Sequence, residues 1–317
     1  MKTILLFLLL TTAFSHAQIQ GCTDALAKNF DANATENNGS CIYKNTKVKP
    51  LSSIKLSDSI SETSGLIAFN HLLWTQNDDH DTTIYGLNTN GEIQKKINLK
   101  AVKNYDWEEI AQDSSYVYIN DFGNNFGNRK DLKILRIEKK SFLSNTPIID
   151  TLHFSYSNQN NFERQKINTT DFDGEAFVIL QDSIYIFTKQ WHSKKTSVYV
   201  LPKTPGNHIA QFKENINVKG LITGATVLPS NKSVVLCGYS KKLKPFVYLL
   251  YDFKNNDFST GNKRKIKLKL PFHQIEGIAT RDGHLFYLTN EAIIRKPLIN
   301  LPQQLHTIDL SNYTKMR

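Results

Sequence analysis

The sequence lacks the motifs that identify the commonest enzyme classes. It contains no glycine-rich phosphate loop, no Gly-x-Ser-x-Gly elbow, no His-Glu-x-x-His helix and no cysteine set with zinc spacing among its three cysteines. No segment has a sustained helical period, and none reaches 18 consecutive apolar residues. These absences argue against the common nucleotide-binding, nucleophile-elbow and zinc classes, and they predict no transmembrane segment in the mature chain.

The first residues have the pattern of a signal peptide. A lysine at position 2 precedes the apolar residues 4–10, and residues 15–17 (SHA) form a small-x-small cleavage site. The apolar run is too short to span a bilayer core of about 30 Å. We therefore expect residues 1–17 to be removed and the protein to be periplasmic, bound at the outer surface or secreted. Residues 19–22 (IQGC) loosely match a lipobox, so a lipoprotein anchored at Cys22 is the alternative.

The composition favours a folded, cationic protein rich in sheet. Apolar residues make up 40% and aromatic residues 11% of the 317 residues, enough for a sizeable core, and the net charge is +10. The basic residues are scattered, and an exported protein does not meet nucleic acid. The expected partner is an extracellular or periplasmic ligand, either a protein or a glycan.

A small module is expected at residues 18–43, followed by a linker at residues 44–50. Cys22 and Cys41 lie close together in an oxidising context, which predicts a disulfide, and Cys237 in an apolar run is expected to be a buried thiol. The module resembles a short "GCTD…GSC" repeat of secreted bacterial surface proteins. Asp24, Asn29 and Asp31 supply oxygen atoms that suit Ca²⁺, or that form turns instead.

Residues 51–317 contain an internal repeat of β-strands. Similar short segments recur around positions 64, 108, 174, 223 and 276, with spacings of 44, 66, 49 and 53 residues. Each is followed at a nearly constant offset by a strand of β-branched and aromatic residues, and a third and a fourth strand can usually be traced. This pattern predicts an all-β fold, a β-propeller of five blades, in which residues 52–56 complete the last blade. A sixth blade within the 66-residue interval and a β-sandwich are the alternatives.

The repeat openings resemble a particular kind of propeller. The segments are residues 106–111 (DWEEIA) with 118–125 (YINDFGNN), residues 171–176 (DFDGEA), and residues 274–279 (QIEGIA) with 288–291 (LTNE). They are similar to openings in propellers of the SdiA-regulated and phytase-like-esterase type. The resemblance implies the propeller fold and ion binding in a central channel.

Propeller topology also predicts where the acidic residues meet. The start of the first strand and the end of the second strand of a blade lie at the same mouth of the channel. Carboxylate and amide side chains occupy these positions: Glu62, Asp78, Glu108, Glu109, Asn120, Asp121, Asp173, Glu175, Glu276, Asn290 and Glu291. The sequence therefore predicts a polar cluster on one axis.

Converging carboxylates favour a divalent cation, and a ring of six to eight oxygens suits Ca²⁺. The metal ligands expected in the channel are Glu108, Asp121, Asp173, Glu175 and Glu276. The alternative is that these acids cap strands or pair with basic residues such as Lys189 and Arg129. We expect an exported binding or interaction module with Ca²⁺ as its candidate cofactor, or alternatively a calcium-dependent phosphoesterase or lactonase with its site at this mouth.

Overall fold

The computed structural model describes residues 18–78, 80–100, 102–144, 146–228, 230, 233–295 and 299–314. The expected signal peptide, residues 1–17, lies outside the described residues. Within them, no helix is both long enough and apolar enough to cross a membrane. The helical elements are short: α1 (Lys139–Leu143), α2 (Ser311–Thr314) and the 3-10 turns η1 (Asp58–Ile60) and η2 (Phe258–Thr260).

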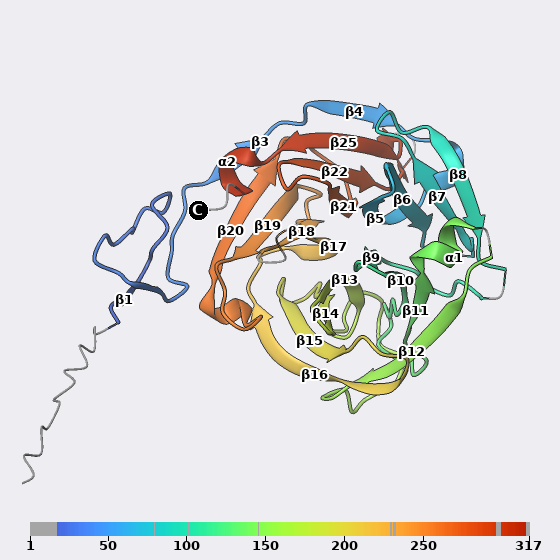
Figure 1. Ribbon diagram of the computed structural model, residues 1–317, viewed down its shortest axis with the longest axis horizontal. Helices are drawn as coiled ribbons and strands as arrows, with labels where there is room; N and C mark the ends of the chain where they lie inside the picture. The colour runs from blue at the N-terminus through green and yellow to red at the C-terminus, as the bar shows by residue number, and fades with distance from the viewer. Residues whose placement is uncertain are drawn as a thin grey trace, which may run out of the picture.

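Four-stranded antiparallel units make up the body of the protein, and Figure 1 shows them arranged around a centre. The first unit contains β5 (Thr63–Phe69), β6 (Leu72–Asn77), β7 (Thr83–Leu87) and β8 (Ile93–Asn98), and the second contains β9 (Ile110–Gln112), β10 (Tyr116–Asp121), β11 (Lys133–Glu138) and β12 (Ile149–Tyr156). The third contains β13 (Gly174–Leu180), β14 (Ser183–Thr188), β15 (Thr196–Pro202) and β16 (Gly206–Ile216). The fourth contains β17 (Leu221–Val227), β18 (Ser233–Tyr239), β19 (Pro245–Tyr251) and β20 (Asn262–Leu268).

The last unit joins the two ends of the repeat region. It contains β21 (Ile275–Thr280), β22 (Leu285–Asn290), β25 (Gln304–Asp309) and, as its outer strand, β4 (Ser52–Lys55). β4 pairs antiparallel with β25, so residues from the start of the repeat region close the last unit, as predicted. A short hairpin of β23 (Ile293–Arg295) and β24 (Ile299–Leu301) is inserted between β22 and β25.

The first strands of the units surround the central axis. They contact one another in the cyclic order β5, β9, β13, β17, β21 and back to β5. This closed ring confirms the all-β propeller and excludes the sandwich alternative. In the described part of the 66-residue interval, the residues beyond β12 form a long loop, residues 157–173, and not a further sheet.

The hydrophobic core consists of layers between neighbouring units. Each buried cluster combines side chains of two adjacent units, as in the cluster where Trp74 of β6 packs edge-on against Phe142 of α1 with 4.9 Å between ring centroids. Successive side chains of a propeller strand point in turn into the two layers on either side of their unit. Both faces of an inner strand are therefore buried, and both carry apolar residues.

Close packing at the axis depends on glycine at two inner-strand positions. A Cβ atom on Gly65 of β5 would lie 2.3 Å from the backbone nitrogen of Ile110, and one on Gly224 of β17 would lie 2.3 Å from the carbonyl oxygen of Glu276. Neither contact is sterically possible, so glycine allows the inner strands to approach one another.

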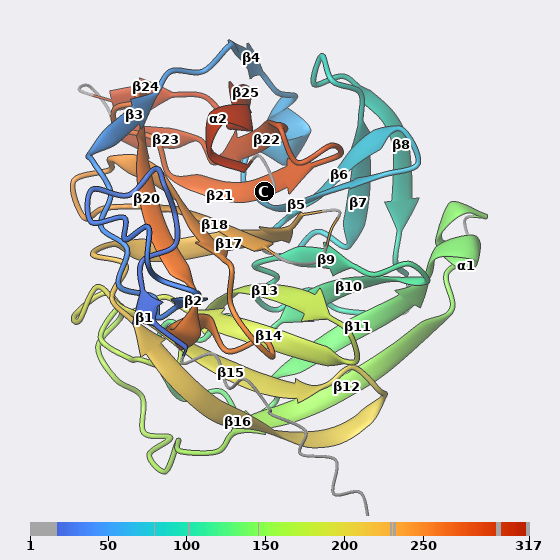
Figure 2. The same ribbon diagram turned by 60° about the vertical axis from the view of Figure 1, so that its left-hand side comes forward.

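The N-terminal module docks on the outside of the fourth unit (Figure 2). Cys22 and Cys41 form the predicted disulfide, and Cys237 is a buried free thiol. The bond uses the sulfur atom of Cys22 that a lipid anchor would need. The module contains the two-residue strands β1 (Gln20–Gly21) and β2 (Glu36–Asn37).

Contacts with β19 hold this module in place. Asp24 Oδ2 accepts hydrogen bonds from the hydroxyls of Tyr43 and Tyr251, at 3.0 and 2.7 Å. Residues 44–50, expected as a linker, include β3 (Thr46–Val48), which pairs in parallel with the outer strand β20. The pairing covers part of the edge of the fourth unit, and the segment is thereby attached along its length.

We expect the double variant Cys22→Ser/Cys41→Ser to destabilise the module selectively. In the chain-entropy model, a closed loop of this size contributes about 3 kcal/mol. Amide hydrogen exchange should therefore accelerate in residues 18–43 and stay unchanged in the five inner strands, β5, β9, β13, β17 and β21. Equal acceleration throughout the protein would show that the disulfide supports the propeller as a whole.

Candidate functional site: an acidic mouth of the central channel

One end of the channel opens into a cavity of about 470 Å³. As the topology requires, its lining comes from the starts of first strands and the ends of second strands. We define the acidic mouth by the carboxyl side chains that line this cavity: Asp78, Asp106, Glu108, Glu175, Glu276 and Glu291. Two cationic side chains, Lys189 and Arg129, also line it.

Lys189 is the cation most deeply placed in the acidic mouth. It directly follows β14, is 9% exposed, and its Nζ lies 3.0 Å from Glu175 Oε2. Burial alone would lower the pKa of this lysine, but the carboxylates of Glu175, Glu276 and Glu108 raise it well above its ordinary value. Lys189 is therefore held as an ammonium ion among the acids. Arg129 instead pairs with Asp121 and Asp131, at 2.9 and 3.1 Å.

The pKa values of the acids are raised, first by burial and then by one another. Burial, with the nearby charge of Asp173, raises the pKa of Asp106 to about 6. Burial raises the pKa of Glu108 well above its usual range, and the charges of Glu175 and Asp106 raise it further. Burial likewise raises the pKa of Glu291 well above the usual range, with Glu276 and Asp78 adding to the shift. If all of these carboxyls were ionised, Lys189 alone could not compensate their charge, and the raised pKa values reflect this.

Asp173 does not line the cavity, but its carboxyl group is close to that of Glu175, which does. Asp173 Oδ1 accepts the backbone N–H of Asn124 at 2.7 Å. Asp173 Oδ2 and Glu175 Oε1 are both buried and receive no hydrogen bond from another residue in the described ranges. A proton on one of the two carboxyls lets them hydrogen-bond to each other.

Two of the expected site residues accept hydrogen bonds from backbone N–H groups and do not face the cavity. Glu109 accepts the backbone N–H groups of Leu66, Ile110 and Ala225 at 3.2, 3.0 and 2.7 Å, and so links three inner strands across the axis. Asn120 Oδ1 accepts the N–H groups of Glu108 and Glu109 at 2.7 and 2.6 Å. Neither side chain lines the cavity.

Three further expected residues are also placed away from the cavity lining. Asp121 is fully buried and pairs with Arg129 and Lys133, at 2.9 and 3.1 Å. Asn290 donates to the carbonyl oxygen of Pro302 at 3.0 Å. Glu62 is not part of the lining, but its charge contributes to the raised pKa of Glu291.

In the N-terminal module, the expected calcium ligands form turns. Asp24 Oδ1 accepts the N–H of Leu26 at 2.8 Å, and Asp31 Oδ1 accepts that of Asn33 at 2.9 Å. Asn29 Oδ1 accepts the N–H of Ile42 at 2.7 Å. These bonds match the turn alternative given by the sequence.

A loop beyond β10 forms one wall of the cavity. Residues 124–126 and 128–129 line it, together with residues 167–168 of the long loop that follows β12. The two loops are joined by backbone bonds from Gln165 N to Phe126 O at 2.9 Å and from Asn168 N to Asn125 O at 3.1 Å. The extra length of the second repeat interval thus builds one side of the acidic mouth.

Sequence reasoning gave Lys189 as an alternative ion-pair partner of the acids, which its contact with Glu175 confirms, and it missed the lining residues Asp106 and Tyr239. Lys189 and Tyr239 stand at the end of the second strand of their units, the position that Asp78 and Glu291 occupy in theirs. Because the search followed carboxylate and amide side chains, it passed over the unit where a tyrosine fills that position and did not place Lys189 itself at the mouth. Asp106 is in the DWEEIA segment and was visible there.

The acidic mouth does not have the geometry of a preformed metal centre. Among the described residues, no group of three or more His, Cys, Asp or Glu side chains is arranged to hold a metal ion. The ammonium of Lys189 lies against Glu175, where a divalent cation would compete with it. The donor chemistry suits a hard cation, whereas the present arrangement accommodates an ammonium group.

Comparison with known proteins gives only distant likenesses. No protein-family model and no curated protein matches this chain. Among solved structures, the PQQ-bound aldose sugar dehydrogenase from Streptomyces coelicolor is similar with a TM-score of 0.46 at 11% identity, over 83% of this chain and 97% of that one.

Two other solved structures are more distant. Hydrazine synthase from Kuenenia stuttgartiensis has a TM-score of 0.39 at 8% identity, over 80% of this chain and 64% of that one. A streptogramin B lyase has a TM-score of 0.39 at 13% identity, over 75% and 68%. At these values we take no functional argument from the likenesses. The resemblance to SdiA-regulated and phytase-like-esterase propellers stays a prediction.

Proposed function

We propose that this protein is an exported binding module that takes a small, positively charged ligand at the acidic mouth. The observation that carries this proposal is the composition of the cavity lining, which has six carboxyl side chains and two cations, Lys189 and Arg129. Arg129 already pairs with Asp121 and Asp131, so Lys189 is the cation left for the six carboxyls. The raised pKa values of these acids mean that they release protons when an added cation binds. The Cys22–Cys41 disulfide supports export, because such bonds are typical of oxidising compartments.

The shape and polarity of the site favour a small ligand. A cavity of about 470 Å³ is within the range of small-molecule sites. The indole N–H of Trp191 is buried at its wall and has no hydrogen-bond partner among the described residues. An ammonium compound fits this lining because Lys189 already shows how the carboxyls receive an ammonium group. Calcium, the cofactor expected from the sequence, and a neutral glycan are the competing ligands.

A thermal-unfolding panel tests the proposal. Cadaverine, an organic diamine, should raise the Tm by about 3 °C or more at saturation, because a ligand that binds only the native state stabilises it. Calcium chloride, chitobiose and sodium sulfate are compared in the same buffer after treatment with chelator. Stabilisation by calcium alone would assign the mouth to the metal, and stabilisation by chitobiose alone would assign it to a glycan.

Variants localise the effect. Glu108→Gln and Glu276→Gln should each remove most of the stabilisation by the cation, whereas Glu92→Gln, an exposed acid distant from the mouth, should retain it. If the two mouth variants lower the Tm equally with and without the cation, these acids are structural and the proposal is wrong.

Hydrolysis is the second candidate function, and one observation favours it. Glu108 and Glu175 are buried carboxyls with raised pKa values at a cavity, which is the condition of a general acid at neutral pH. A screen with p-nitrophenyl acetate, a γ-lactone and p-nitrophenyl phosphate, with and without calcium and chelator, tests it. Turnover that is lost in Glu108→Gln would establish an enzyme, and no turnover of any substrate would leave the binding module.

A further inference from the structure

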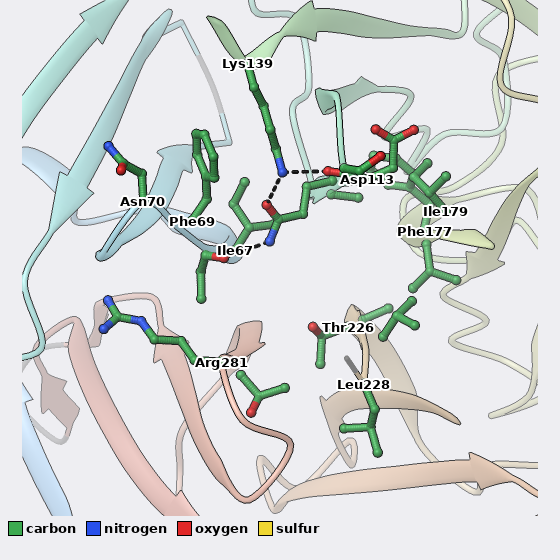
Figure 3. A pocket seen from close by; sticks show the side chains of 18 of the residues that line it. Ile67, Phe69, Asn70, Asp113, Lys139, Phe177, Ile179, Thr226, Leu228 and Arg281 are labelled. Atoms are coloured by element: carbon green, nitrogen blue, oxygen red, sulfur yellow. Dashed lines mark hydrogen bonds between the residues drawn. The ribbon is translucent and has the colours of Figure 1, made fainter. Parts of the chain in front are cut away.

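A second cavity, of about 610 Å³, lies at the other end of the channel (Figure 3). Most of its lining comes from the ends of the first strands, at residues 67–71, 111–114, 177–179, 181, 225–228 and 280–281. These are the opposite ends of the strands whose starts form the acidic mouth. The two cavities therefore occupy opposite mouths of one propeller.

The walls of this second cavity combine apolar with polar side chains. Ile67 and Phe69 lie on one side in Figure 3, and Phe177 and Ile179 lie on the other, with Leu228 below. Phe69 is partly exposed within the opening, while Ile67 and Ile179 are 5% and 6% exposed. A ligand with a hydrocarbon body would cover this surface.

The charge at this mouth is opposite to that of the acidic mouth. Lys139, Lys203 and Arg281 line it with a single carboxylate, Asp113. Lys203 pairs with Asp113 at 3.2 Å and also with Asp182. We call this end the basic mouth.

Two of these cations have only neutral partners. Lys139 Nζ donates to Gln112 Oε1 and to the carbonyl oxygen of Asp113, at 2.9 and 2.5 Å, and lies 4.4 Å from the ring centroid of Phe69. Arg281 donates to the carbonyl oxygen of His71 at 2.5 Å. In the described ranges, neither forms an ion pair with a carboxylate. Two cations without a carboxylate partner, one of them beside the partly exposed ring of Phe69, favour an anion as their counterpart.

We propose that the basic mouth binds a small amphiphilic carboxylate. The hydrocarbon body would lie against the partly exposed Phe69, and the carboxylate would accept a hydrogen bond from Lys139, while Arg281 adds positive charge from another side of the cavity (Figure 3). Phe69 offers an apolar contact that an inorganic anion cannot use, and the cationic side chains disfavour amines. This inference does not rest on the function proposed for the acidic mouth, because it involves a different cavity with a different charge.

Isothermal titration with four probes tests the proposed ligand class. Octanoate has both the body and the charge, octylamine has the same body with the opposite charge, octanol has the body alone, and acetate has the charge alone. Octanoate should bind at least about tenfold more tightly than each of the others, because each lacks one of the two contacts. Equal affinity for octanoate and octylamine, or no binding of octanoate, would overturn the proposal.

Charge variants test the location. Arg281→Gln and Lys139→Gln should each weaken octanoate binding by about tenfold. Lys267→Gln removes an exposed lysine from the outer strand β20 and should leave the affinity unchanged. Thr226→Glu adds a negative charge inside the cavity without removing a cation, and should also weaken binding by at least tenfold. It keeps the test valid if a cation variant folds poorly. Unchanged affinity in Thr226→Glu would place the octanoate elsewhere.

Discussion

Replacing Lys189 with methionine should lower the free energy of unfolding by about 4 kcal/mol at pH 7, since removing one partner of a buried ion pair leaves the other charge uncompensated. Lys189 Nζ is 3.0 Å from Glu175 Oε2, and both side chains are buried. Methionine keeps most of the volume of the lysine stem, so the loss comes mainly from charge. Urea denaturation followed by tryptophan fluorescence measures it.

The loss should depend on pH in a defined direction. Burial already raises the pKa of Glu175, so in the native state this group holds its proton to a higher pH than in the unfolded state. Such a group stabilises the fold below its unfolded pKa of about 4.3, and that contribution is lost as the pH rises through the folded value. Removing Lys189 raises the folded pKa further, so the deficit of the variant should be large at pH 7 and small at pH 4.

Two control variants separate charge from packing. Lys96→Met removes an exposed lysine from the outer strand β8 and should change stability by less than about 0.5 kcal/mol. The double variant Lys189→Met/Glu175→Gln removes both partners and should recover more than half of the loss. A deficit that is the same at pH 4 and pH 7, and that the double variant does not reduce, would mean that Lys189 acts through packing alone.

The second large effect is expected at the closure of the propeller. Acidification should weaken the native state through His306 of β25, which is fully buried and joins strands from both ends of the repeat region. Its Nδ1 lies 2.8 Å from Ser53 Oγ of β4, and its Nε2 lies 2.7 Å from Asn290 Oδ1 of β22. Because Asn290 Oδ1 can only accept, the network assigns the ring proton to Nε2 and lets Nδ1 accept from the serine hydroxyl.

Burial, followed by the nearby His273, lowers the pKa of His306 to about 3. In the unfolded chain, His306 therefore binds a proton at about pH 6.5, whereas in the native state it binds one only near pH 3. Stability from this group is complete above pH 6.5 and falls as the pH decreases, by about 5 kcal/mol in total. The expected slope is opposite to that of the acidic mouth carboxyls, so the variant comparison is needed to isolate it.

His306→Gln isolates the effect because glutamine does not titrate. The stability advantage of the wild type over this variant should shrink steadily between pH 7 and pH 4 in urea denaturation. His153→Gln, which replaces an exposed histidine of β12, should leave the pH profile unchanged. Parallel profiles for the wild type and His306→Gln would show that His306 does not carry the acid sensitivity.

Part of this molecule could be predicted from the order of residues alone. Alternating β-branched and aromatic runs at a repeated spacing indicate strands locally, and the propeller follows from their number and interval. The pairing of β4 with β25 was predictable because the last repeat lacked a strand and residues 52–56 had no other unit to join. The Cys22–Cys41 bond followed from spacing and context. These features depend on short-range pattern, which the sequence displays directly.

The composition of the candidate site depended on the tertiary structure. The topology placed Glu108, Glu175 and Glu276 at one mouth, but Glu109 and Asn120 occupy equivalent positions and serve backbone N–H groups instead. Which acid faces the cavity is decided by contacts between strands of different units, and no local pattern records those contacts. The same holds for the basic mouth, where Lys139 and Arg281 are 142 positions apart in the numbering and line one cavity only because the ring closes.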